Sequence, residues 1–137
     1  MRRKTHWLIY SLIVLLLFSF CGCGQEASQN GEGDVTVRVE LPEKAYETGF
    51  TAGEGITALD MLVEMGKIVG FPVVSQGSSF GAYVTGIDNV FQFDQGPESG
   101  WIYSINGESP TVGASSYEPV AGDVILWQYI TSYDQTK

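Results

Sequence analysis

Polar and apolar residues alternate in the segment from Val35 to Leu41, where valine occupies every second position at the start. A period of two residues is typical of a strand that buries one face. The residues from Pro42 to Gly53 predict a hairpin return, with a second and weaker strand from Ala45 to Thr51. The chain therefore begins its regular structure with two neighbouring strands.

A helical period replaces the alternation over residues 58–68. Thr57 is the expected N-cap, and Asp60 completes a variant of the capping box. Gly70 and Pro72 predict the end of the helix. The apolar positions fall on one side of the helix, namely Leu59, Leu62, Val63, Met65 and Val69.

Short strands are predicted after the helix over residues 83–87, 90–93, 101–105 and 124–128. Asn106-Gly107 predicts a tight turn, because this pair accepts the positive φ angles of a type I′ hairpin. One amphipathic helix can cover only one face of a small sheet. We therefore expect an α+β fold, with a small β-grasp-like mixed sheet and one main helix packed on one face.

Four aromatic residues, which we call the aromatic shelf, fall on two of these strands: Trp101, Tyr103, Trp127 and Tyr129. Two interpretations are open. Either the rings pair across the strands as part of the core, or they lie on the sheet face that the helix leaves bare and form a platform for a flat ligand. Tyr117, in the small-residue loop 113–117, is expected at the rim of the same site.

The N-terminus has the layout of a bacterial secretory signal, with Arg2, Arg3 and Lys4 before an apolar run over 7–20. Gly22 before Cys23 is typical of a lipoprotein signal. We therefore expect a signal peptide over 1–22, lipidation of Cys23, a flexible tether over 23–33, and a tail over 132–137. The chain would be exported and lipid-anchored at the extracellular face of the cell membrane. The alternative is an uncleaved membrane span, because the run is nearly long enough to cross a bilayer.

The composition excludes several classes of function. Residues 23–137 hold four Lys/Arg against sixteen Asp/Glu, a formal charge of −12, which would repel nucleic acid. No cysteine follows Cys23, and His6 is the sole histidine of the sequence. These counts argue against nucleophilic catalysis and against thiolate or histidine zinc sites. Asp88, Asn89 and Asp94 do not match the spacing of a calcium loop. We expect no enzyme activity, no catalytic residue and no metal site.

Three ordered motifs carry a family resemblance: GAYVTGIDN at 81–89, GWIYSING at 100–107, and GASSYEP at 113–119 followed by GDVI at 122–125. They resemble the transcobalamin-like C-terminal domain family, also called DUF4430, over residues 34–131. In the vertebrate cobalamin carriers, a domain of this kind closes over one face of the corrin, and a larger helical domain holds the other face.

The resemblance implies ligand contacts in three places: Tyr83 and Thr85 on one strand, Trp101, Ile102 and Tyr103 on another, and Tyr117 in the loop. It implies a surface-anchored lipoprotein that binds a cobalamin-like corrinoid or another flat small ligand, for delivery to a membrane transporter. The corrinoid would be a ligand and not a covalent cofactor. The alternative is a non-catalytic interaction module that docks a second surface protein through its aromatic face or a sheet edge.

Overall fold

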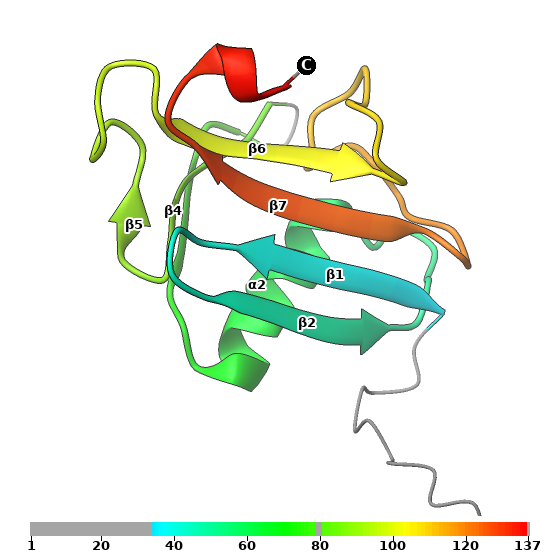
Figure 1. Ribbon diagram of the computed structural model, residues 1–137. Coiled ribbons are helices and arrows are strands. Elements are labelled where there is room, and N and C mark those ends of the chain that lie inside the picture. Colours follow the sequence, from blue (N-terminus) through cyan, green and yellow to red (C-terminus); the bar gives the residue numbers. More distant parts are fainter. Residues whose placement is uncertain (1–33, 79–80, 137) are drawn as a thin grey trace, which may run out of the picture.

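The structure is a computed structural model that describes residues 34–78 and 81–136 (Figure 1). Its elements, in chain order, are β1 (Val35–Glu40), β2 (Ala45–Phe50), α2 (Ala58–Val69), β3 (Val73–Gln76), β4 (Tyr83–Ile87), β5 (Val90–Phe91), β6 (Gly100–Ile105), β7 (Val124–Ile130) and the 3₁₀ helix η1 (Tyr133–Thr136). The predicted signal peptide, Cys23 and tether lie outside the described residues. Within 34–78 and 81–136, no helix has the length and apolarity needed to span a membrane.

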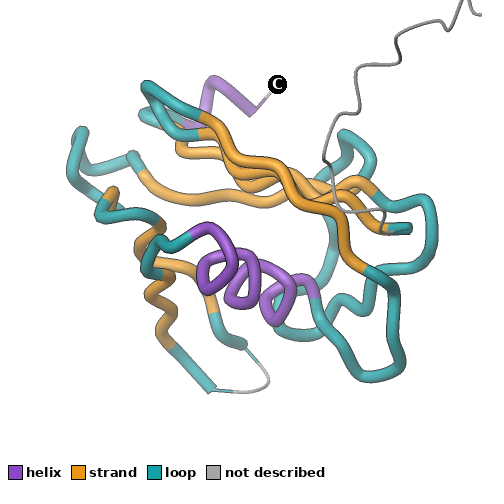
Figure 2. The backbone as a smooth tube through the Cα atoms, turned by 90° about the horizontal axis from the view of Figure 1, so that it is seen from below, coloured by secondary structure: helices purple, strands orange, loops and turns teal. Residues whose placement is uncertain are grey.

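The main sheet has four strands in the order β2-β1-β7-β6. β1 and β7 pair in parallel at its centre, and the two outer pairs are antiparallel. α2 packs on one face of this sheet, and a second, antiparallel sheet of β3, β4 and β5 stands beside the helix (Figure 2). The predicted α+β class with one main helix is confirmed, and the second sheet adds a strand, β3, that the pattern did not predict.

The helix begins and ends where its sequence signals predict. The Thr57 hydroxyl accepts a hydrogen bond from the Asp60 N–H at 3.2 Å, and the Asp60 carboxylate accepts one from the Thr57 N–H at 2.9 Å. Gly70 closes the helix in the left-handed conformation, at φ 95°. Helix and main sheet share a core of fully buried side chains: Val35, Val37, Val39, Met61, Leu62, Met65 and Ile125.

Two local predictions need correction. The strand expected over 90–93 ends at Phe91, because the Asp94 carboxylate accepts a hydrogen bond from the Phe91 N–H at 2.8 Å and Phe93 turns to φ 71°. Phe91 and Phe93 therefore do not share one strand face. Asn106 and Gly107 have the expected positive φ angles, but the turn leads to a single bridge at Glu108, and the chain rejoins the main sheet only at β7.

Candidate functional site

The aromatic shelf lies on the helix side of the main sheet. In the strand register, Tyr103 pairs with Trp127, Trp101 pairs with Tyr129, and Trp127 also pairs with the buried Val39 of β1. Directly paired residues point to the same face of a sheet. The interpretation that put these rings on the bare face is therefore wrong, and Trp127 and Tyr129, both buried, belong to the interior.

The rings of the aromatic shelf contact each other and hold β5 in place. Tyr103 stacks on Trp127 with ring centroids 5.2 Å apart, and Trp101 meets Tyr129 edge-on at 5.3 Å. The Trp101 indole N–H donates to the Val90 carbonyl at 2.9 Å. The Tyr129 hydroxyl lies 2.8 Å from the Phe91 carbonyl, to which it donates. The polar atoms of Trp101 and Tyr129 are thus satisfied within the protein.

A pocket of about 220 Å³ opens beside Trp101, where the first residues of β4 and β6 meet the end of β7, the turn 92–99 and η1. We call it the aromatic pocket. Four rings line it, together with three polar and three aliphatic side chains and Gly100: Tyr83, Phe93, Trp101 and Tyr133; Gln92, Glu98 and Ser99; Val84, Ile102 and Ile130. A concave site with aromatic walls and a few polar groups suits a small ligand.

Three of the six residues implied by the family resemblance meet at this pocket: Tyr83, Trp101 and Ile102. The other three lie elsewhere. Thr85 is buried, and its hydroxyl donates to the Val74 carbonyl at 3.3 Å. Tyr103 donates to the Val112 carbonyl, and burial, with Tyr117 nearby, raises the pKa of its hydroxyl.

Tyr117 is held by Asp123, to which its hydroxyl donates at 2.8 Å. Burial and the adjacent carboxylate both raise the pKa of Tyr117. Its backbone carbonyl accepts a hydrogen bond from the Ala58 N–H at 2.8 Å, so the loop also covers the start of α2. In the structure, Tyr117 joins the long loop to the helix and does not line the aromatic pocket.

Phe93 is a pocket residue that the sequence did not reveal. Its side chain is 62% exposed, and its backbone adopts a left-handed conformation that bulky residues rarely take. The Phe93 N–H donates to the Ser99 carbonyl at 2.9 Å, which holds the turn in this conformation. An exposed ring on a strained backbone beside a pocket is a feature found at binding sites. Glu98 and Tyr133 were missed as well, because nothing local to their segments signals the pocket.

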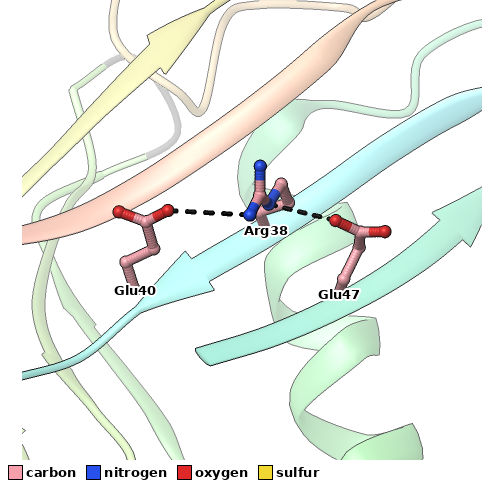
Figure 3. A network of polar contacts seen from close by, with 3 residues as sticks. All are labelled: Arg38, Glu40 and Glu47. Carbon is pink, nitrogen blue, oxygen red and sulfur yellow. Dashed lines mark ion pairs between the residues drawn. The ribbon is translucent and has the colours of Figure 1, made fainter. Parts of the chain in front are cut away.

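Acidic residues dominate the electrostatics. The three basic side chains within the described part of the chain all pair with carboxylates: Lys44 with Asp88 at 2.5 Å, Lys67 with Glu64 at 2.8 Å, and Arg38 with Glu47 at 3.0 Å and Glu40 at 3.8 Å. Figure 3 shows Arg38 between its two partners on β1 and β2. Arg38 alternates with buried valines and so lies on the sheet face away from α2. None of these bases lines the aromatic pocket.

A second hollow of about 440 Å³ lies between β2 and α2, with Phe50, Ile56 and Met61 among its walls. It contains no residue implied by the resemblance. Among the described residues, no three His, Cys, Asp or Glu side chains gather as a metal-binding group.

Comparison with known proteins finds a family by sequence and two similar folds by structure. The sequence model of DUF4430, a domain of unknown function, matches residues 55–131. No curated protein matches the chain. A crystal structure described as a candidate metal binding protein from Ruminococcus gnavus ATCC 29149 aligns with a TM-score of 0.54 at 17% identity, over 72% of this chain and 97% of that one.

The crystal structure of haptocorrin in complex with Cbi aligns with a TM-score of 0.56 at 23% identity. The alignment covers 68% of this chain and 24% of the haptocorrin chain. This chain therefore resembles about a quarter of haptocorrin. At these identities, both alignments establish a shared fold. Both neighbours are described as binding proteins and neither as an enzyme.

Proposed function

Because this chain belongs to the DUF4430 family, we propose that it is a non-catalytic binding protein that takes a cobalamin-like corrinoid, or another flat small ligand, at the aromatic pocket. The observation that carries the proposal is the gathering of Tyr83, Phe93, Trp101 and Tyr133 around one hollow. Tyr83 and Phe93 are 53% and 62% exposed, so their rings are available to a ligand face. When a flat apolar ligand stacks on such rings, its surface is removed from water, and each Å² of apolar surface buried contributes about 25 cal/mol to the free energy of binding.

The size of the pocket limits what it can do alone. At about 220 Å³, it lies below the range of about 300–1,000 Å³ of sites that enclose a drug-sized ligand. A corrinoid would therefore rest one edge or face there and remain open elsewhere. The haptocorrin alignment supports this half-site, because it spans 24% of a protein whose structure contains Cbi. A second protein, such as a transporter, would cover the rest of the ligand.

The setting we propose is the outer surface of the cell. Residues 1–22 would be a lipoprotein signal peptide, and lipidated Cys23 would hold the exported domain at the extracellular face of the membrane. The support is the sequence itself, in which a basic segment and an apolar run precede Gly22-Cys23. Anchoring there would let the domain pass its ligand to a membrane transporter.

Docking of a second surface protein is the competing function, and the geometry favours it less. Such docking needs a broad exposed apolar patch. On the bare sheet face, Arg38 with Glu40 and Glu47 forms a charged network. The exposed rings of Tyr83 and Phe93 instead share a hollow, which suits a small molecule.

The test is a titration of the full-length chain in lipid nanodiscs with dicyanocobinamide, followed by calorimetry and by the corrin absorbance. We expect saturable binding of the wild type. Phe93→Gly should weaken it about tenfold, or ~1.4 kcal/mol, because a stacked ring is lost. Glycine suits φ 71°, and the relief of strain should offset its greater freedom when unfolded, so the melting temperature should change little.

Val120→Ala is the matched control, because Val120 is also 62% exposed but lies in the loop before β7, away from the pocket. It should bind like the wild type. No binding of the corrinoid by the wild type would contradict corrinoid capture. Binding that Phe93→Gly leaves unchanged would mean that the ligand sits elsewhere.

A further inference from the structure

Among the described residues, the turn over residues 92–99 supplies the non-aromatic polar side chains of the aromatic pocket, namely Gln92, Glu98 and Ser99. Hydrogen bonds hold it firmly. The Ser99 hydroxyl donates to the Gly96 carbonyl at 2.8 Å and accepts from the Gln95 N–H at 3.1 Å. The Tyr129 hydroxyl lies 3.0 Å from the same Ser99 oxygen and ties the turn to β7. The backbone of the turn is therefore fixed, and it places Gln92 and Glu98 at the wall of the pocket.

Among the residues that the structure describes, Glu98 is the one carboxylate that lines the pocket, and no Lys, Arg or His lines it. An ionised carboxylate accepts hydrogen bonds and cannot donate them. The basic residues of the described part cannot compensate, because Arg38, Lys44 and Lys67 are each paired elsewhere. A ligand edge that carries N–H donors thus finds an acceptor here, whereas a carboxylate edge meets a like charge.

We propose that Glu98 makes the aromatic pocket selective for ligands whose edge carries amide or ammonium N–H groups, and that it rejects the same ring system when its edge carries carboxylates. This inference rests on the proposed function, since it names the chemical class of flat ligand that the pocket accepts. Two flat ligands of the same shape are then separated by the chemistry of their edges. The aromatic rings contact either ligand equally, and Glu98 determines which of the two binds more tightly.

The experiment compares two probes that differ in this respect, dicyanocobinamide with amide side chains and dicyanocobyrinic acid with carboxylates. Both are titrated against full-length wild type, Glu98→Gln and Glu108→Gln in nanodiscs at neutral pH. Glu108 is exposed in the turn at the opposite end of β6, so its change alters the net charge equally without touching the pocket. It therefore reports the general repulsion of an anion by an acidic protein.

We expect the wild type and Glu108→Gln to prefer the amide probe by about tenfold or more, and Glu98→Gln to reduce that preference to about threefold or less. The same preference in all three proteins would overturn the inference and leave the proposed function standing. Failure of both probes to bind the wild type would contradict the proposed function and the inference together. Equal melting temperatures of the three proteins would confirm that the variants are folded.

Discussion

At the scale of single residues, Asp123 accepts three hydrogen bonds through one buried carboxylate outside the pocket. It is 6% exposed, and its carboxylate accepts hydrogen bonds from the Asn106 side-chain amide at 2.8 Å, the Tyr117 hydroxyl at 2.8 Å and the Val120 N–H at 3.0 Å. Burial acts to raise the pKa of this carboxyl, but the three hydrogen bonds outweigh burial and hold it below the ordinary value of 3.8. One ionised side chain thus fixes the long loop between β6 and β7.

Asp123→Asn should therefore destabilise the protein by about 2 kcal/mol, because the new NH₂ group faces donors and the charge-assisted bonds are lost. Urea unfolding followed by tryptophan fluorescence measures the change. Glu43→Gln, at an exposed position in the turn between β1 and β2, removes the same charge and should stay within about 0.5 kcal/mol of the wild type. If both variants unfold alike, the loop does not depend on Asp123.

At the scale of elements, the contact between the end of α2 and the start of β3 depends on a missing side chain. A Cβ on Gly66 would lie 2.7 Å from the Phe71 carbonyl oxygen and 3.0 Å from a Val73 methyl group. The Gly66 carbonyl also accepts from the N–H groups of Gly70 and Phe71, both at 2.9 Å. The chain can therefore turn back closely over the helix because residue 66 has no side chain.

Gly66→Ala should destabilise the protein by about 1–3 kcal/mol, although alanine in a helix interior ordinarily gains about 1 kcal/mol over glycine. The atom that must move is backbone, so the clash cannot be relieved by a rotamer change. The matched control is Gly113→Ala, where the nearest atom to the new Cβ is the Ser115 hydroxyl at 4.0 Å, and it should be close to neutral. The melting temperatures of both variants, compared with that of the wild type, test this prediction. A higher melting temperature for Gly66→Ala would contradict it and show that the turn can shift.

Elements with strong local signals could be predicted, and those without could not. β1 has clean alternation, and α2 has both caps, so each forms where the pattern indicates. β3 has four residues, three of them exposed, and a shift of register against β4, so its pairing and not its own pattern makes it a strand. β5 stops early because the Asp94 side chain accepts a hydrogen bond from the Phe91 N–H, a local turn contact that the alternation of apolar residues does not indicate.

The same distinction holds for the residues of the site: those in sequence motifs could be predicted, and those placed by the turn could not. Tyr83, Trp101 and Ile102 stood in recognisable motifs and meet at one pocket. Phe93 and Glu98 reach it through a turn whose left-handed backbone is held by Ser99 and Tyr129, and no short pattern encodes that arrangement. The aromatic shelf was placed on the wrong face because the parallel pairing of β1 with β7, which joins distant parts of the chain, sets which side meets the helix.

At the scale of the whole molecule, two carboxylates join segments that are far apart in the sequence. Asp123 fixes the loop before β7, and Asp88 joins the turn after β4 to the first hairpin. The Asp88 carboxylate lies 2.5 Å from the Lys44 ammonium and accepts from the Tyr46 hydroxyl at 2.7 Å. The hydrogen bonds from Lys44 and Tyr46 hold the pKa of Asp88 below its ordinary value, and burial opposes them less strongly. Both carboxyls are therefore more acidic in the folded protein than in the unfolded chain.

A group whose pKa is lower in the folded state stabilises the fold above its unfolded pKa of about 3.9, and that contribution disappears as the pH falls through the folded pKa. The unfolded chain binds the protons first, so stability falls with pH in this range. Protonation of the many exposed acids also relieves repulsion in a chain with a formal net charge of −9, which acts in the opposite direction. The melting temperature of the wild type alone therefore does not isolate the two carboxylates.

The difference between the wild type and an Asp88→Asn/Asp123→Asn double variant does isolate them, because the repulsion among the other acids is common to both proteins. Melting temperatures measured from pH 7 to pH 2 should differ most above about pH 4 and converge below it, as the wild-type carboxyls take up the protons that the amides mimic. Curves that stay parallel down to pH 2 would mean that neither carboxyl has a pKa lowered by folding. A wild-type advantage that grows as the pH falls from 6 to 4 would mean that burial outweighs hydrogen bonding and raises their pKa, because the folded protein would then bind the protons first.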